Sequence, residues 1–118
     1  MTFDIIGLCR DEPGAEATIE ALLVAGPELL VAEHADSGVT RLHHPDGRPL
    51  VVIEDIRLVR VAGEAHRLLG LDAETEVPHP VWWVESRAPD DDPEAETVAR
   101  TFIGALLERT GGLSWSNR

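Results

Sequence analysis

The chain has 118 residues, of which 43% are hydrophobic and 27% charged, and its formal net charge is −12 at pH 7. This length suits one domain, so we expect residues 1–118 to form a single globular unit. The charge disfavours nucleic acid and anionic membranes as partners, since like charges repel, and no apolar run approaches the roughly 20 residues that a membrane helix needs.

The first segment predicts a strand. Residues 2–9 form an apolar run that ends at RDEPG, which is typical of a strand buried on both sides. Cys9 ends this run beside Arg10, and a neighbouring cation can lower a thiol pKa. No nearby residue supplies a base, so a buried, unreactive cysteine is the preferred interpretation. A single cysteine and the absence of a secretory signal predict a cytoplasmic location.

A helix should follow within residues 12–27. Gly26 and Pro27 supply its stop, and the acidic Glu16 and Glu20 mark its outer side. Four apolar residues recur at helical spacing, and we expect them to face the core: Ala15, Ile19, Leu22 and Leu23.

Antiparallel strands should fill the middle of the chain. Residues 28–35 and 39–44 are strand-like and flank a DSG turn, which suits a hairpin. Residues 50–61 are long for one strand, and their apolar pattern breaks at Glu54 and Asp55. We therefore expect a bulge or a division into two strands there.

A short helix and a central strand come next. Residues 63–70 allow about two helical turns, with Leu68 and Leu69 facing inward. Residues 81–88 form a strand whose two faces both begin apolar, which favours a central position in the sheet.

The last helix is predicted within residues 90–112. Asp92 suits the N-cap and Pro93 the first helical position. Residues 113–115 can return as a short strand. The expected inward stripe of the helix consists of Ala95, Val98, Ala99, Phe102 and Leu106.

Two strand–helix units around a strand-rich middle predict an α+β fold. We expect a single antiparallel or mixed sheet with two main helices on one face, in a ferredoxin-like split β-α-β arrangement.

The preferred functional hypothesis is a non-catalytic domain that binds a basic protein. Residues 1–36 carry eight acids and one Arg, and residues 71–118 carry ten acids and four Arg, so the negative charge is concentrated at the two ends of the chain. If those ends meet, they form one negative surface, and an adjacent tryptophan can anchor the partner. The candidate partner-binding residues are Trp82, Trp83, Asp90, Asp91, Asp92 and Glu94.

Histidines carry a second hypothesis, a small metal- or histidine-dependent enzyme. His43 and His44 are adjacent on a predicted strand and point to opposite faces, so they cannot bind one ion together without distortion. A neighbouring strand could bring His34 beside one of them, and nearby carboxylates could complete a ligand set: Asp36, Asp46 or Glu54. No HExxH, CxxC or phosphate-binding glycine loop is present, and we predict no cofactor.

Acid–base residues also occur on the short helix. Glu64, His66 and Arg67 could support catalysis in principle, but Glu64 and Arg67 are spaced i, i+3 and more commonly form an exposed ion pair.

The segment GEAHRLLGL…PVWWVESRAP, followed by an acid-capped helix and GGLSW, resembles small uncharacterised bacterial proteins. Some of these are immunity partners of polymorphic toxins. The resemblance spans roughly residues 60–115, implies binding to a toxin, and brings no site residues with it. An acidic secretion chaperone and a homodimer that pairs its open sheet face remain alternatives.

Overall fold

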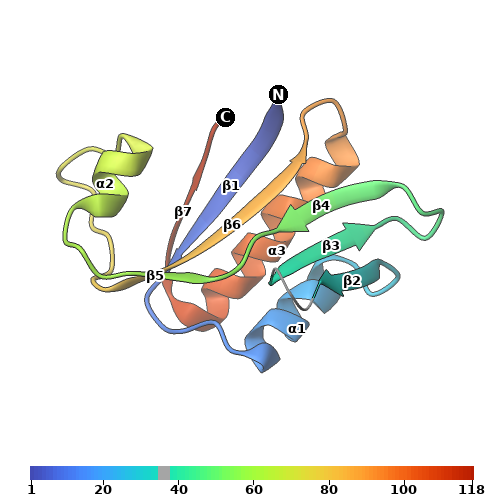
Figure 1. Ribbon diagram of the computed structural model, residues 1–118, viewed down its shortest axis with the longest axis horizontal. Coiled ribbons are helices and arrows are strands. Elements are labelled where there is room, and N and C mark those ends of the chain that lie inside the picture. Colours follow the sequence, from blue (N-terminus) through green and yellow to red (C-terminus); the bar gives the residue numbers. More distant parts are fainter. Residues whose placement is uncertain (35–37) are drawn as a thin grey trace.

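The computed structural model describes residues 1–34 and 38–118, and these form one antiparallel sheet of seven strands with three helices (Figure 1). The α+β class is therefore confirmed. The strands are β1 (Thr2–Cys9), β2 (Leu30–His34), β3 (Val39–His43), β4 (Pro49–Ile53), β5 (Arg57–Val59), β6 (Val81–Pro89) and β7 (Gly112–Ser116). The helices are α1 (Ala15–Ala25), α2 (Glu64–Leu69) and α3 (Pro93–Thr110).

The sheet has the order β2-β3-β4-β6-β1-β7, and β5 also pairs with β6. The central position predicted for the strand at 81–88 is confirmed. The predicted division of residues 50–61 is confirmed as well, because β4 and β5 pair with β6 separately, at Val52↔Arg87 and at Leu58↔Trp82. Helix α3 connects β6 to β7, which lie on either side of β1.

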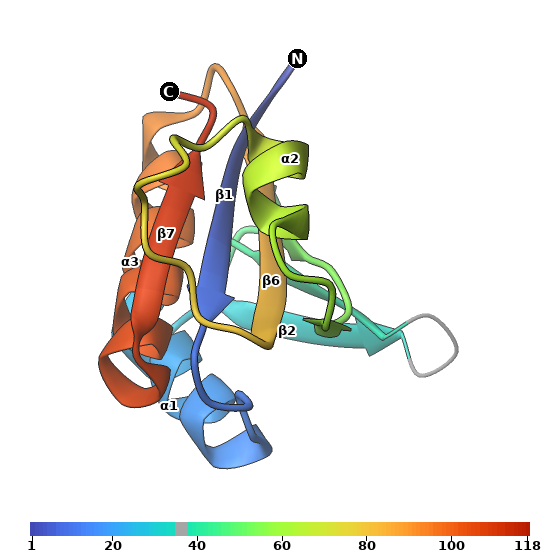
Figure 2. The same ribbon diagram turned by 90° about the vertical axis from the view of Figure 1, so that its left-hand side faces the viewer.

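Helix α3 packs on one face of the sheet, against β1, β4 and β6 (Figure 2). Asp92 caps the helix as predicted, because its side chain accepts a hydrogen bond from the Ala95 backbone N–H at 3.2 Å. Every residue of the predicted inward stripe is buried, and so is Ile103, which the stripe had left out.

Helix α1 packs against α3, and three of the four residues predicted to face the core are exposed instead. Ala15 is exposed, and the side chains of Ile19 and Leu23 are each 56% exposed. Leu22 packs against the core as predicted. Beside it lie alanines spaced four residues apart, of which Ala21 is buried and Ala17 and Ala25 are partly buried against the core. Small side chains at this spacing let two helices approach closely, so the larger apolar residues are displaced toward solvent.

A second, smaller core lies on the opposite face, beneath α2 and the connection from residue 71 to residue 80 (Figure 2). Its buried members are Ile6, Leu8, Ala65, Val81 and Trp83. Leu69 packs against this core as predicted, whereas Leu68 is 53% exposed. Ala65 and Leu69, four residues apart, already occupy the inner face of this six-residue helix, so Leu68 points outward.

Candidate functional site

The two tryptophans lie on opposite faces of β6, as their adjacency predicts, and neither is an exposed anchor. Trp83 is 5% exposed within the core beneath α2, and its indole N–H donates to Glu85 Oε1 at 3.3 Å. Trp82 is half-buried and packs against the core beneath α3.

The four acidic candidates, which we call the acid block, lie just beyond the other end of β6: Asp90, Asp91, Asp92 and Glu94. Eight residues separate Trp82 from Asp90, which corresponds to about 26 Å along an extended strand. The structure therefore does not bring the tryptophans and the acid block together into one site.

Most of the acid block is also engaged within the chain. Arg48, in the turn before β4, forms ion pairs with both Asp92 and Glu94. The carboxylate of Asp90 lies 3.9 Å from the N-terminal amine. Asp91 is exposed and has no ion pair to another residue that the structure describes.

The environment of Asp92 fits a structural role. Desolvation would raise the pKa of its carboxyl group, but the Ala95 N–H and the guanidinium of Arg48 outweigh this effect and hold the pKa below its usual range. Asp92 therefore stabilises the start of α3 as a carboxylate.

The acids around the start of α1 form a separate group. The backbone N–H groups of Arg10 and Asp11 donate to Gly111 O and Thr110 O, each at 3.0 Å, so α1 begins beside the C-terminal end of α3. The acid block lies at the N-terminal end of the same helix, whose 18 residues span about 27 Å. These two groups do not form the single negative surface expected from the sequence.

The histidine candidates are dispersed where they are described. His44 Nδ1 lies 3.2 Å from an Asp46 oxygen, while Glu54 lies 3.8 Å from a nitrogen of Arg87. Asp36 and the side chain of His34 lie outside the described residues. Within residues 1–34 and 38–118, no group of three or more His, Cys, Asp and Glu side chains is arranged to hold a metal ion.

The remaining reactive candidates have structural partners. Glu64 and Arg67 form the ion pair favoured by their spacing, and His66 Nε2 lies 2.7 Å from Thr75 O. Cys9 is completely buried. Desolvation raises the pKa of the Cys9 thiol and outweighs the hydrogen bond from Thr110, in agreement with an unreactive cysteine.

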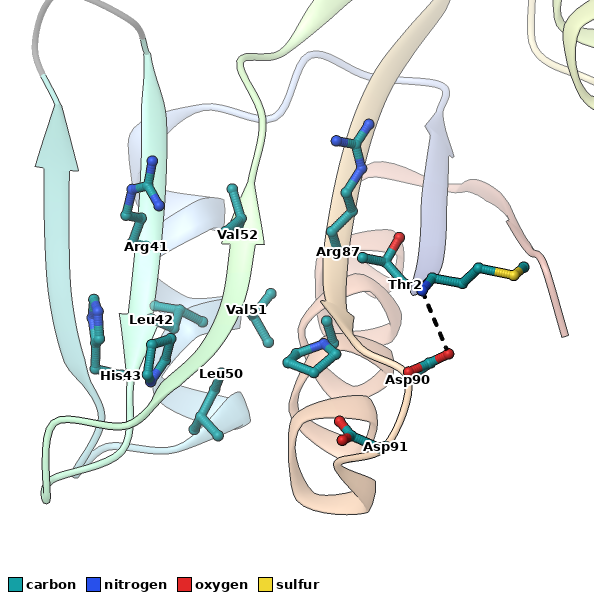
Figure 3. Close-up of a pocket in the computed structure, with 14 residues that line it drawn as sticks. Thr2, Arg41, Leu42, His43, Leu50, Val51, Val52, Arg87, Asp90 and Asp91 are labelled. Carbon is teal, nitrogen blue, oxygen red and sulfur yellow. Dashed lines mark ion pairs between the residues drawn. The ribbon is translucent and has the colours of Figure 1, made fainter.

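A groove lies on the helix-free part of the second face, where β4 and β6 diverge (Figure 3). The two strands pair only at Val52↔Arg87 and Ile53↔Ser86, so the segments beyond these pairs separate. The resulting pocket has a volume of about 470 Å³, within the range of about 300–1,000 Å³ common for small-molecule sites. We call it the open-face groove.

Two arginines flank this groove. Arg41 pairs with Val52 and Val52 with Arg87, so the three residues form one row across β3, β4 and β6 (Figure 3). Arg87 is compensated by three carboxylates, because it contacts Glu85 at 2.5 Å, Asp4 at 3.6 Å and Glu54 at 3.8 Å.

Arg41 differs from Arg87 in its charge environment. It is exposed, and it makes no ion pair with another described residue. Local sequence patterns do not reveal this site, because the two arginines lie on non-adjacent strands and align only when the strand order is known.

A second surface lies between α1 and the edge strand β2, and we call it the α1–β2 surface. It contains a pocket of about 250 Å³ whose lining includes Ile19, Leu23, Leu29 and Val31. Three of these side chains are large and strongly exposed: Ile19 and Leu23 at 56% each and Val31 at 50%. Glu33 lies at the edge of the pocket.

No protein-family model matches this chain, and no curated protein is significantly similar to it. In the part of the chain that the structure describes, none of the helices has the length and apolar character needed to cross a lipid bilayer.

Proposed function

We propose that this chain is a non-catalytic protein-binding domain that recognises a basic protein through the α1–β2 surface. The observation that carries the proposal is a group of exposed apolar side chains on α1 and β2, with Glu33 in the lining of their pocket.

The apolar content supports an interface. Large apolar side chains are scattered singly over most protein surfaces, whereas contiguous exposed groups mark contacts with other molecules. Ile19, Leu23 and Val31 line one pocket and are half exposed or more. Moreover, β2 is an edge strand, so one side of its backbone can accept a strand from a partner.

The charge supports a basic partner. Residues 11–33, which include α1 and most of β2, contain six acids and no Lys or Arg. Arg109 on α3 pairs with one of the six, Glu20. A second copy of this chain would bring two such acidic segments together, which costs free energy, whereas a cationic protein would be attracted and would associate faster.

We also propose a ferredoxin-like topology for the sheet. Strands β6 and β7 flank β1 and are joined by α3, while β1 and β4 flank β6 and are separated in sequence by α1, β2 and β3. These two interlocked units support a ferredoxin-like split β-α-β arrangement. The more specific role is a cytoplasmic immunity or inhibitor protein for a basic toxin or effector. Its binding residues then lie on α1 and β2, and not at Trp82, Trp83 or the acid block.

The test compares two leucine variants. Leu23→Glu places a negative charge in the α1–β2 surface. Leu68→Glu is the control, because it places the same charge on α2 at a leucine of similar exposure. Each purified variant, with folding verified by circular dichroism, is immobilised and exposed to nuclease-treated extract of the native host at low and moderate salt.

The expected result is a basic protein retained by the parent and by Leu68→Glu, lost with Leu23→Glu, and released as salt rises. Equal retention by all three proteins, or retention of acidic proteins alone, would contradict the proposal.

A further inference from the structure

We propose that the open-face groove is a binding site for a small amphipathic carboxylate, with the carboxylate paired to Arg41 and the apolar chain lying over β4. This site is on the sheet face opposite to α3 and does not depend on the proposed protein-binding function.

The groove offers an apolar floor that a hydrocarbon chain can cover. Its lining reaches the core residues Leu50, Val51 and Ala88, each at most 2% exposed, and includes Val52, Pro49 and Pro89. Figure 3 shows Val51 and Val52 on β4 between Arg41 and the Arg87 strand. Burying apolar ligand surface on such a floor is favourable at about 25 cal/mol per Å².

Arg41 supplies the polar end of the site. A guanidinium presents a planar fork that matches a carboxylate in a bidentate geometry. The three carboxylates near Arg87 compensate its charge, whereas Arg41, about 10 Å away across two strand spacings, has no described ion-pair partner. An anionic group should therefore prefer the β3 side of the groove.

The carboxylates at the other end restrict the ligand further. Asp90 and Asp91 line the groove near the end of β6 (Figure 3). The N-terminal amine pairs with Asp90, whereas Asp91 has no ion pair to a described residue, so Asp91 would repel a second negative charge on the ligand. A ligand with one carboxylate can pair with Arg41 and place its apolar part near the acidic end of the groove. A dianion would place its second charge beside a carboxylate.

The experiment uses decanoate as the probe and ¹⁵N–¹H NMR spectra of the full chain as the readout. Decanol has the same chain without the charge, and decylamine carries the opposite charge. The variant is Arg41→Gln, and the matched control is Arg60→Gln, because Arg60 is also exposed and lies outside the groove lining.

We expect saturable shift changes at the amides of Arg41, Val52 and Ala88. Decanoate should bind at least about fivefold more tightly than decanol, and Arg41→Gln should remove this preference while Arg60→Gln retains it. Decylamine should bind more weakly than decanoate.

Three results would overturn the proposal. Decanol and decanoate could bind the parent equally well, which would remove the role of Arg41. The shifts could cluster at Ile19 and Leu23, which would place the ligand on the α1–β2 surface. The spectra could show no saturable change at all, which would leave the groove without this ligand class.

Discussion

Replacing Ser86 with alanine should stabilise the protein, although most substitutions of fully buried residues destabilise. Ser86 is completely buried on β6 between Ile5 of β1 and Ile53 of β4. Its hydroxyl has no hydrogen-bond partner among the described residues. A hydroxyl in this position loses its hydrogen bonds to water on folding and regains none.

The expected gain follows from two opposing effects. A buried hydroxyl without a partner costs about 1–3 kcal/mol in protein mutational data. The void left by one oxygen is on the order of 10 Å³ and costs about 0.2 kcal/mol at about 24 cal/mol per Å³. The net gain from Ser86→Ala is about 1 kcal/mol. With an unfolding entropy of about 250 cal/mol/K for a chain of this length, the melting temperature should rise by about 4 °C.

Thermal and urea unfolding, followed by circular dichroism and tryptophan fluorescence, measure this change. Ser114→Ala is the control, because Ser114 is exposed on β7 and its replacement should change the stability by less than about 0.5 kcal/mol. A Ser86→Ala protein that is less stable than the parent would show that the hydroxyl has a stabilising partner and that the reasoning is wrong.

Four further outcomes are expected. A Cβ at Gly112, where φ is +118°, would lie 1.9 Å from Leu8 O, so Gly112→Ala should cost roughly 3 kcal/mol or more in urea unfolding. Gly104→Ala, on the exposed side of α3 with no heavy atom within 4 Å of the added Cβ, should stabilise by about 1 kcal/mol, and equal effects at both glycines would refute this distinction. Since the folded pKa of Asp92 is depressed, its contribution is present above the unfolded pKa of about 3.9 and is lost as pH falls. The difference in urea midpoint between the parent and Asp92→Ala should accordingly shrink below about pH 4, and a constant difference down to pH 2 would argue against this linkage. The Cys9 thiol should react with Ellman's reagent at pH 8 more than about 100-fold faster in denaturant than in the native state, and similar rates would contradict its burial.

The elements that the sequence predicts well are those with local signals. The N-cap Asp92 and the following Pro93 define the start of α3, and the polar pair Glu54 and Asp55 separates β4 from β5. Capping and turn chemistry act over a few residues, so they are visible without knowledge of the tertiary contacts.

The buried face of α1 could not be predicted in this way. Apolar periodicity points to Ile19 and Leu23, but the partner of α1 is another helix, and a row of alanines meets it. Which face of a helix is buried depends on the element that packs against it, and the sequence of the helix alone does not contain this information. The same error conceals the α1–β2 surface, because periodicity assigns two of its exposed residues, Ile19 and Leu23, to the core.

The separation of the tryptophans from the acid block was, by contrast, available from strand geometry. Trp82 and Asp90 are eight residues apart in one extended segment, which fixes their separation at about 26 Å. The open-face groove required the structure, because its shape follows from the divergence of β4 from β6 after only two paired positions.

The distribution of ion pairs decides where the net charge of −12 is least compensated. Seven of the ten arginines form ion pairs with described carboxylates: Arg48, Arg57, Arg67, Arg87, Arg100, Arg109 and Arg118. Of these seven, Arg109 alone pairs with a described carboxylate of α1. The acid block, which has the highest density of carboxylates in the sequence, is held by Arg48 and the N-terminal amine and serves to cap α3. Because surface charges are screened beyond about 8 Å at physiological ionic strength, a basic protein responds to local charge more than to the total. It should therefore approach α1, where acids outnumber cations and apolar side chains lie exposed beside them.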